Sequence, residues 1–230
     1  MATLTTVALH LLGTHWETPS LGAAGWVERP FDLDPSETGL VALHLWSVGD
    51  VSGPPIPDRY LVDMGLPEVQ AESLRICERY IRPAIEASRA AGLPIFHVEP
   101  YNIAKQYDSH RYLLDDDEVP IASRSQNGSA EANPGWQRER AERTHGHGYQ
   151  EWDGWEQMRI AAACEPEAGD QVIVTTRQFD RICRSREIKN LVYTGFATNM
   201  CIMHSPAATV EMLGYGYKVF LVREATLAVE

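Results

Sequence analysis

The apolar residues of this chain gather in short continuous runs separated by polar or helical stretches. Continuous apolar runs of this length are typical of strands that are buried on both faces of a parallel sheet. The runs fall at 39–46, 93–98, 171–176, 191–194 and 217–222. From about 68 to 91 the apolar residues instead recur at helical spacing, and Gly92 then predicts the helix end.

The order strand, helix, strand predicts right-handed βαβ units. Pro83 inside the helical stretch predicts a kink or two segments. Shorter helices are expected at 154–164 and 179–187. The whole pattern predicts an α/β fold: an open, mostly parallel sheet of five to six strands with helices on both faces, in a Rossmann-like three-layer arrangement. Ligands of such sheets bind beyond the carboxyl ends of the strands.

Two regions interrupt this rhythm. Residues 1–37 are expected to form an irregular N-terminal extension whose scattered aromatic residues cover the body or a neighbouring subunit. Residues 38–230 form the main domain, with a polar insert at about 101–150. The insert's polar stretches at 115–118, 123–129 and 137–143 lack periodicity, so a lid, an oligomer arm or a mobile loop is expected there.

The net charge limits the classes of binding partner, and the cysteine content indicates the cellular compartment. The net charge of −12 argues against nucleic acid or an anionic membrane as partner, and no apolar run approaches a membrane span. The N-terminus lacks the basic start of a signal peptide. The four scattered cysteines contain no CxxC pair. That pattern predicts reduced thiols and a cytoplasmic location.

The stretch from Thr194 to His204 carries the clearest chemistry. It reads as a buried strand, a turn opened by Gly195, and a helix start with Thr198 and Asn199 as N-cap residues. Cys201 then falls in the first turn of a helix at the carboxyl edge of the sheet. The helix dipole there lowers a thiol pKa from about 8.5, which favours a nucleophile. The alternative is a small buried core residue, as free cysteines usually are.

The segment Thr194–Ile202, read T-G-F-A-T-N-M-C-I, resembles the TG-x-x-T-N-x-C-V signature of the isochorismatase-like cysteine hydrolases. That group includes nicotinamidases, N-carbamoylsarcosine amidohydrolases and ureidoacrylate-type amidohydrolases. The segments 81–98, 167–174 and 214–222 support the resemblance, which covers about 39–100 and 154–226. It implies that Cys201 is a nucleophile forming a covalent acyl-enzyme. It also implies a cis peptide bond between Phe196 and Ala197, and an oxyanion hole built from the N–H groups of Ala197 and Cys201.

The chain departs from the family pattern at the other catalytic positions. His44 stands where the family has its basic Asp, and Trp46 stands where it has Gln. Thr175 matches the family's Lys, with Arg177 as the nearest cation. If the site is active, His44 forms a Cys–His dyad with Cys201, and Arg177 or the insert supplies positive charge. If it is not, His44 is a core histidine and the protein binds a ligand or partner without hydrolysis.

Five residues are candidates for binding the substrate: Trp46, His97, Glu99, Tyr101 and Trp155. His145 and His147 resemble a metal fragment, and Asp50 or Asp58 could join His97 and Glu99. Neither set has compact ligand spacing, so we predict no metal and no cofactor. The predicted function is hydrolysis of a non-peptide C–N bond in a small amide, imide or ureide by a homo-oligomer. The alternative is an inactive family member that binds a small ligand or a partner protein.

Overall fold

A five-stranded parallel sheet forms the centre of the molecule in this computed structural model, which describes residues 8–18, 22, 25–58, 60–111 and 134–229. The strand order is β5-β4-β3-β6-β7, and every neighbouring pair is parallel. The strands are β3 (Thr38–Leu43), β4 (Ile95–Val98), β5 (Gln171–Ile173), β6 (Asn190–Phe196) and β7 (Lys218–Leu227). The predicted open parallel α/β sheet is therefore confirmed.

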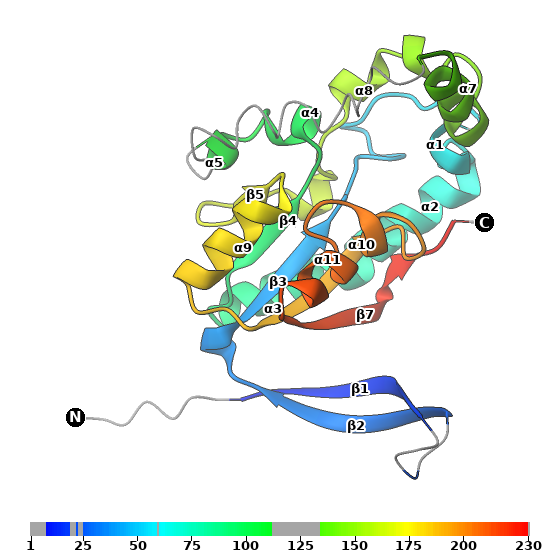
Figure 1. Ribbon diagram of the computed structural model, residues 1–230. Coiled ribbons are helices and arrows are strands. Elements are labelled where there is room, and N and C mark those ends of the chain that lie inside the picture. The colour runs from blue at the N-terminus through cyan, green and yellow to red at the C-terminus, as the bar shows by residue number, and fades with distance from the viewer. Residues whose placement is uncertain (1–7, 19–21, 23–24, 59, 112–133, 230) are drawn as a thin grey trace.

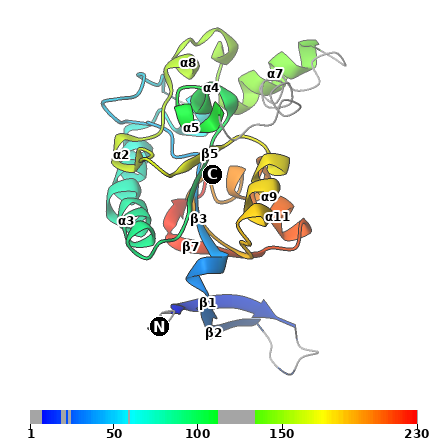
Figure 2. The ribbon, with the colours of Figure 1, turned by 90° about the vertical axis from the view of Figure 1, so that its left-hand side faces the viewer.

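Helices cover both faces of the sheet, as Figures 1 and 2 show. One face carries α2 (Pro67–Ile76) and α3 (Arg82–Ala90), and the other carries α9 (Thr176–Ser185) and α11 (Thr209–Gly214). The alternation of side chains along a strand explains the two cores. In β3, Leu40 and Ala42 join the core on the α2–α3 side, whereas Val41 and Leu43 join the core on the α9–α11 side. No helix among the described residues is long and apolar enough to cross a membrane.

The predicted break near Pro83 is a single turn of π-helix. This turn, η3 (Cys77–Ile81), joins α2 to α3 without interrupting the helical path. The Arg82 N–H donates to the carbonyl of Cys77, five residues earlier. Proline cannot continue the usual hydrogen-bond ladder, and a π-turn absorbs the mismatch.

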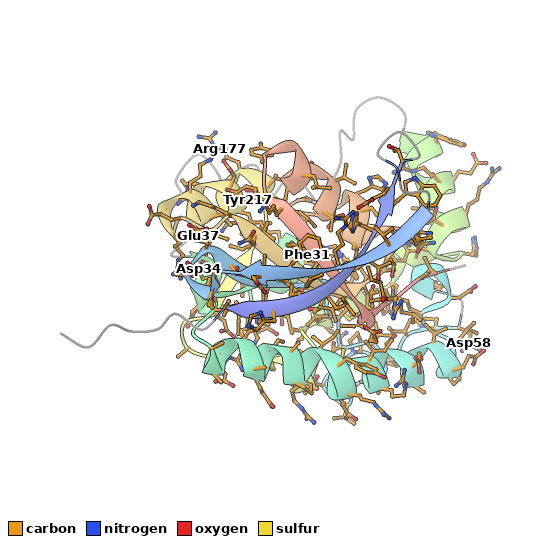
Figure 3. The ribbon with its side chains drawn as sticks, turned by 90° about the horizontal axis from the view of Figure 1, so that it is seen from below. Phe31, Asp34, Glu37, Asp58, Arg177 and Tyr217 are labelled. Atoms are coloured by element: carbon orange, nitrogen blue, oxygen red, sulfur yellow. The ribbon has the colours of Figure 1, made fainter. Side chains whose placement is uncertain are left out.

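The N-terminal extension is a β-hairpin, so the expectation of an irregular segment was wrong. Strands β1 (Leu9–Glu17) and β2 (Gly25–Leu33) pair antiparallel. Its inner face packs on the body, with Phe31 edge-on to Phe220 of β7 at a centroid distance of 5.4 Å. Figure 3 shows the hairpin lying across the underside of the molecule. On its outer face Trp16 and Trp26 pack edge to face and remain exposed.

The insert contains more regular structure than its sequence predicted. Residues 115–118 and 123–129 lie outside the described part of the chain, but 137–143 belong to helix α7 (Pro134–His145). Exposed i,i+4 ion pairs support this polar helix without an apolar stripe, among them Arg138 with Glu142. The remaining short elements are η2 (Pro35–Glu37), α1 (Tyr60–Asp63), α4 (Tyr101–Ala104), α5 (Asp108–Arg111), η4 (Tyr149–Glu151), α8 (Gly154–Gln157), η5 (Ala162–Cys164) and α10 (Cys201–His204).

The chain changes direction across the sheet between β3 and β6, which makes their carboxyl ends the expected ligand site. Gly195 of β6 lies beside Leu43 of β3 with φ of 117°. A Cβ at this glycine would lie 1.9 Å from the Leu43 carbonyl oxygen, so only glycine permits this approach.

The helix predicted after β6 is broken into two parts. Thr198 and Asn199 do not cap it: Thr198 bonds Thr226, and Asn199 exchanges two hydrogen bonds with the backbone of Val229. Helix α10 starts at Cys201 and ends after one turn, and the chain then passes through Pro206 before α11 begins.

Candidate active site

A largely apolar pocket opens beyond the carboxyl ends of β3 and β6. It encloses about 730 Å³ including its open mouth. Its walls come from the β3 exit, α2, the end of α7, the turn after β6 and the end of β7. The lining residues are His44, Trp46, Val48, Met64, Val69, Ser73, His145, Tyr149, Phe196, Ala197, Met200, Cys201, Leu227 and Val229.

Cys201 opens α10 at the wall of this pocket and is half-buried. The peptide bond between Phe196 and Ala197 is cis, as the resemblance implied. Burial raises the pKa of the Cys201 thiol, while a hydrogen bond from the Ala197 N–H opposes this shift. The thiol is therefore protonated at neutral pH. The expected lowering of this pKa was wrong. The start of a one-turn helix stabilises the thiolate less than burial destabilises it.

His44 follows the last residue of β3 in the left-handed region, with φ of 51°. Histidine is among the non-glycine residues that adopt this conformation more readily. Its ring stacks on Trp46 at a centroid distance of 5.1 Å, and its buried Nδ1 has no hydrogen-bond partner among the described residues. Burial lowers the pKa of His44 to about 3, so the imidazole is neutral. His44 and Cys201 line the same pocket, yet no hydrogen bond joins their side chains in the described structure.

Thr175 and Arg177 do not reach this pocket, which corrects their expected catalytic placement. Thr175 is the N-cap of α9: its hydroxyl accepts from the Gln178 N–H at 3.1 Å, within a capping box. Arg177 lies on the exposed side of the first turn of α9, and Figure 3 shows it at the periphery of the molecule. The helix cap thus accounts for Thr175, and its match to the family's Lys position carries no catalytic geometry.

Of the residues expected to bind substrate, only Trp46 lines the pocket. Glu99 lies fully buried behind it and accepts hydrogen bonds from the Leu45 N–H at 3.0 Å and the Trp46 indole at 3.1 Å. Burial raises the pKa of Glu99 well above its usual range, although both hydrogen bonds oppose this shift. Glu99 therefore fixes the β3 exit instead of contacting ligand.

The other three candidates also lie outside the pocket lining. Trp155 packs edge-on against Trp46 at 5.0 Å, so it supports the wall from behind. Tyr101 packs beside a small core that contains Val172 and Val174. The His97 Nε2 lies 3.4 Å from Asp170 Oδ2, in a buried cluster away from the pocket. These residues contribute to the fold around the site.

Comparison with known proteins assigns the family. The model of the isochorismatase domain matches residues 70–230. The chain belongs to the isochorismatase family. The resemblance carried by Thr194–Ile202 is thereby confirmed, and hydrolase-type chemistry is what the family implies. Strand β3 and His44 precede the matched region.

Individual relatives are distant from this member of the family. A segment of 56 residues is 39% identical to the ureidoacrylate amidohydrolase RutB of Pseudomonas savastanoi pv. phaseolicola, covering 21% of this chain and 22% of that protein. A cysteine hydrolase from Pseudomonas syringae pv. phaseolicola is 14% identical, with a TM-score of 0.47 over 86% of this chain and 75% of that one. An isochorismatase family protein from Desulfovibrio vulgaris is 19% identical, with a TM-score of 0.48 over 84% and 83% of the two chains.

The structure places in the pocket several residues for which the sequence predicted no substrate contact; His145 was a candidate only for a metal fragment. His145 and Tyr149 come from the insert, and Met200 and Val229 close the wall near the nucleophile turn. The sequence did contain a signal for His145, namely the segment His145-Gly-His-Gly-Tyr149, in which two glycines follow the end of a helix. Such glycines indicate a turn, and the turn fixes the position of the histidine ring. The polar insert therefore supplies one wall of the isochorismatase-family pocket.

The residues at this site do not fit a metal ion. No group of three or more His, Cys, Asp and Glu side chains converges anywhere in the described ranges. Asp50 accepts from the backbone N–H groups of Ser52 and Ala162, and Asp58 is exposed at the edge seen in Figure 3. His147 faces Glu142 on the surface at 3.3 Å.

Proposed function

We propose that this chain is a cysteine-dependent hydrolase that cleaves a non-peptide C–N bond in a small amide, imide or ureide. The observation that carries the proposal is the shared pocket of Cys201 and His44, with the Ala197 N–H directed at the Cys201 sulfur. A thiol, a neutral imidazole and an amide N–H are the groups that acyl transfer requires. The name of the amidohydrolase that matches a short segment agrees with this bond type.

The first half-reaction forms the acyl-enzyme. The Cys201 thiol gives its proton to the neutral His44 imidazole while sulfur attacks the carbonyl carbon, and the C=O electron pair moves onto oxygen. The N–H groups of Ala197 and Cys201 stabilise that oxyanion. When the carbonyl re-forms, the C–N bond breaks and the leaving nitrogen takes the proton from the imidazolium.

The second half-reaction restores the free thiol. A water molecule gives a proton to His44 as its oxygen attacks the thioester carbon. The tetrahedral species collapses, the C–S bond breaks, and the Cys201 sulfur recovers the proton from His44. The products are a carboxylic acid from an amide or imide, or a carbamic acid from a ureide, together with the ammonia, amine or amide released in the first half-reaction.

The test compares Cys201→Ser with Cys183→Ala in the full chain. Cys183 is buried in the core on the α9–α11 side, away from the pocket, and serves as a matched control. We expect ammonia release from an amide, imide and ureide panel to fall at least about 1000-fold in Cys201→Ser and to stay within about twofold in Cys183→Ala. Mass spectrometry should detect an acyl adduct on Cys201 after quenching.

A non-catalytic ligand-binding role is the second candidate, and the protonation states favour it. The thiol pKa is raised and the His44 pKa is about 3, so proton transfer between them is unfavourable at rest. No Lys or Arg is among the described residues that line the pocket. This role predicts no adduct and no turnover on any member of the panel, with ligand affinity unchanged in Cys201→Ser.

Homo-oligomeric assembly and a cytoplasmic location stay predictions. The outer face of the hairpin supports assembly, because Leu12, Trp16 and Trp26 are all more than half exposed there: 71%, 58% and 72%. Apolar patches of this kind on a surface often mark contacts with other chains.

A further inference from the structure

The second imidazole of the pocket belongs to His145, at the last position of α7. It lines the same cavity as Cys201 but comes from a different layer of the molecule. Its Nδ1 is shielded from solvent and has no hydrogen-bond partner among the described residues. Buried polar atoms in folded proteins are nearly always hydrogen-bonded, so an unpartnered nitrogen on a ring that lines a cavity points to a ligand atom.

Residues close to His145 in the fold hold its ring in place. Its ring packs on Tyr149 at a centroid distance of 4.5 Å. The Tyr60 hydroxyl donates to the carbonyl of His147, and the Tyr60 ring lies edge-on to Tyr149 and Trp152 at 6.3 and 5.9 Å. Figure 1 shows α7 beside α1 above the carboxyl end of the sheet. This anchoring makes His145 a fixed feature of the pocket wall.

The pocket carries no formal charge on its described lining. Its polar side chains are His44, Ser73, His145, Tyr149 and Cys201, besides the Trp46 indole that already donates to Glu99. Burial lowers the pKa of both histidines, so both rings are neutral at physiological pH. A carboxylate that entered would lose its hydration without gaining a counterion from the described lining, because Arg140, whose charge reaches His145, is exposed and lies outside that lining. An uncharged carbonyl or amide would lose far less.

We propose that His145 is a specificity-determining residue that hydrogen-bonds the polar group of an uncharged substrate with an apolar body, so that the site accepts neutral amides and rejects those bearing a carboxylate. The neutral ring offers one N–H donor and one acceptor nitrogen, which match the two sides of an amide. The apolar remainder of the substrate fits against Val69, Met64 and Met200. The inference rests on the proposed function for the identity of the reacting bond, but not for binding itself.

Binding measurements in a Cys201→Ala background separate this inference from hydrolysis. The ligands are benzamide, 2-naphthamide and phenylurea, each paired with its carboxylate-bearing analogue, and affinity is measured by calorimetry. We expect each neutral ligand that binds to do so at least tenfold more tightly than its charged partner. His145→Leu should weaken that binding at least tenfold, and His145→Gln should restore part of it.

His147→Gln is the matched control, because the His147 side chain is exposed and meets only Glu142 on the surface, while the backbone carbonyl that accepts from Tyr60 is kept in the variant. It should change affinity less than twofold. Thermal melting of each variant shows whether the fold survives. If His145→Leu is destabilised, the comparison of ligand affinity between His145→Gln and His147→Gln decides the question. Unchanged affinity in folded His145 variants, equal affinity for charged analogues, or no binding of any neutral ligand would overturn the inference. Binding as expected without turnover by the unmodified enzyme would instead reject the proposed hydrolase.

Discussion

His97 on β4 and His44 just beyond the end of β3 lie on neighbouring strands, and both are buried. The His97 Nε2 faces Asp170, whose carboxylate also pairs with Arg89. In the part of the chain that the structure describes, no acidic side chain lies within hydrogen-bonding range of His44, whose ring stacks on Trp46 and lines the pocket. A histidine fixed by charged partners contributes to stability, while one left beside an aromatic ring and a cavity keeps its nitrogen available for a ligand.

The two surroundings also differ in charge. The Asp170 carboxylate joins α3, β4 and the turn before β5, and the Glu167 N–H donates to it at 2.9 Å. Burial raises the pKa of Asp170, but hydrogen bonds from His97, Arg89 and Glu167 outweigh it and hold the pKa at about 2. This cluster is therefore charged at neutral pH, whereas the pocket is not.

Among the variants that test this comparison, the largest effect is expected from His44→Gln, which keeps the side-chain volume but removes the imidazole that would accept the proton. Loss of a general base lowers kcat/KM by about 100-fold or more. The melting temperature should fall only modestly. The imidazole makes no side-chain hydrogen bond among the described residues, but glutamine adopts the left-handed backbone of position 44 less readily than histidine and cannot stack on Trp46 in the same way. Steady-state kinetics on the best substrate of the amide panel measure this. His97→Gln is the control, expected to keep kcat per folded molecule within about twofold; an equal loss there would erase the distinction between the two histidines.

A middle effect is expected from Asp170→Asn, on stability alone. The folded-state pKa of about 2 lies below the ordinary 3.8. The carboxylate therefore stabilises the fold above about pH 4, and that contribution disappears as the pH falls toward 2. The variant should lose about 2 kcal/mol of unfolding free energy at pH 7 and much less near pH 2.5. Urea denaturation at both pH values measures this; a difference independent of pH would show that the charge is not responsible.

The smallest effect is expected from Glu99→Gln. Because burial raises the pKa of this carboxyl well above its usual range, the group is uncharged behind the pocket, and an amide resembles it. Glutamine can still accept from the Leu45 N–H but not from the Trp46 indole as well, so one hydrogen bond is lost, worth about 1 kcal/mol. Chemical denaturation and tryptophan fluorescence report the change. A loss of more than about 3 kcal/mol would indicate that an ionised carboxylate was removed.

The sheet could be predicted because each buried strand has a continuous run of apolar residues, and because helices between the runs indicate parallel pairing of the strands. The hairpin could not be found so easily. Its alternating pattern is interrupted by Leu12 and Gly13 in one strand and by Pro30 in the other. Helix α7 was missed for another reason. It is stabilised by charged pairs at helical spacing, and a search for periodic apolar residues does not detect such pairs.

The site residues likewise fall into those that the sequence predicted and those that it did not. The Cys201 turn was predicted because the residues that carry it are contiguous in the chain. Local signals misled where one residue type can serve two purposes. Thr175 caps a helix at a position that matches a catalytic residue of the family, and Asn199, predicted as a helix cap, instead bonds the backbone of Val229 just after β7. His145 could not be assigned, since its importance comes only from the folding of the insert over the strand ends.

The pairing of β3 with β6 also governs the order of assembly. The segments that form β4 and β5 lie between these strands in the chain, so the pairing closes a long loop. Contacts of such sequence separation form slowly compared with helices and hairpins. We therefore expect His44 and Cys201 to come together after the helices and the hairpin have formed. A partly folded chain carries the thiol and the imidazole but not the cavity that gives either one its chemistry.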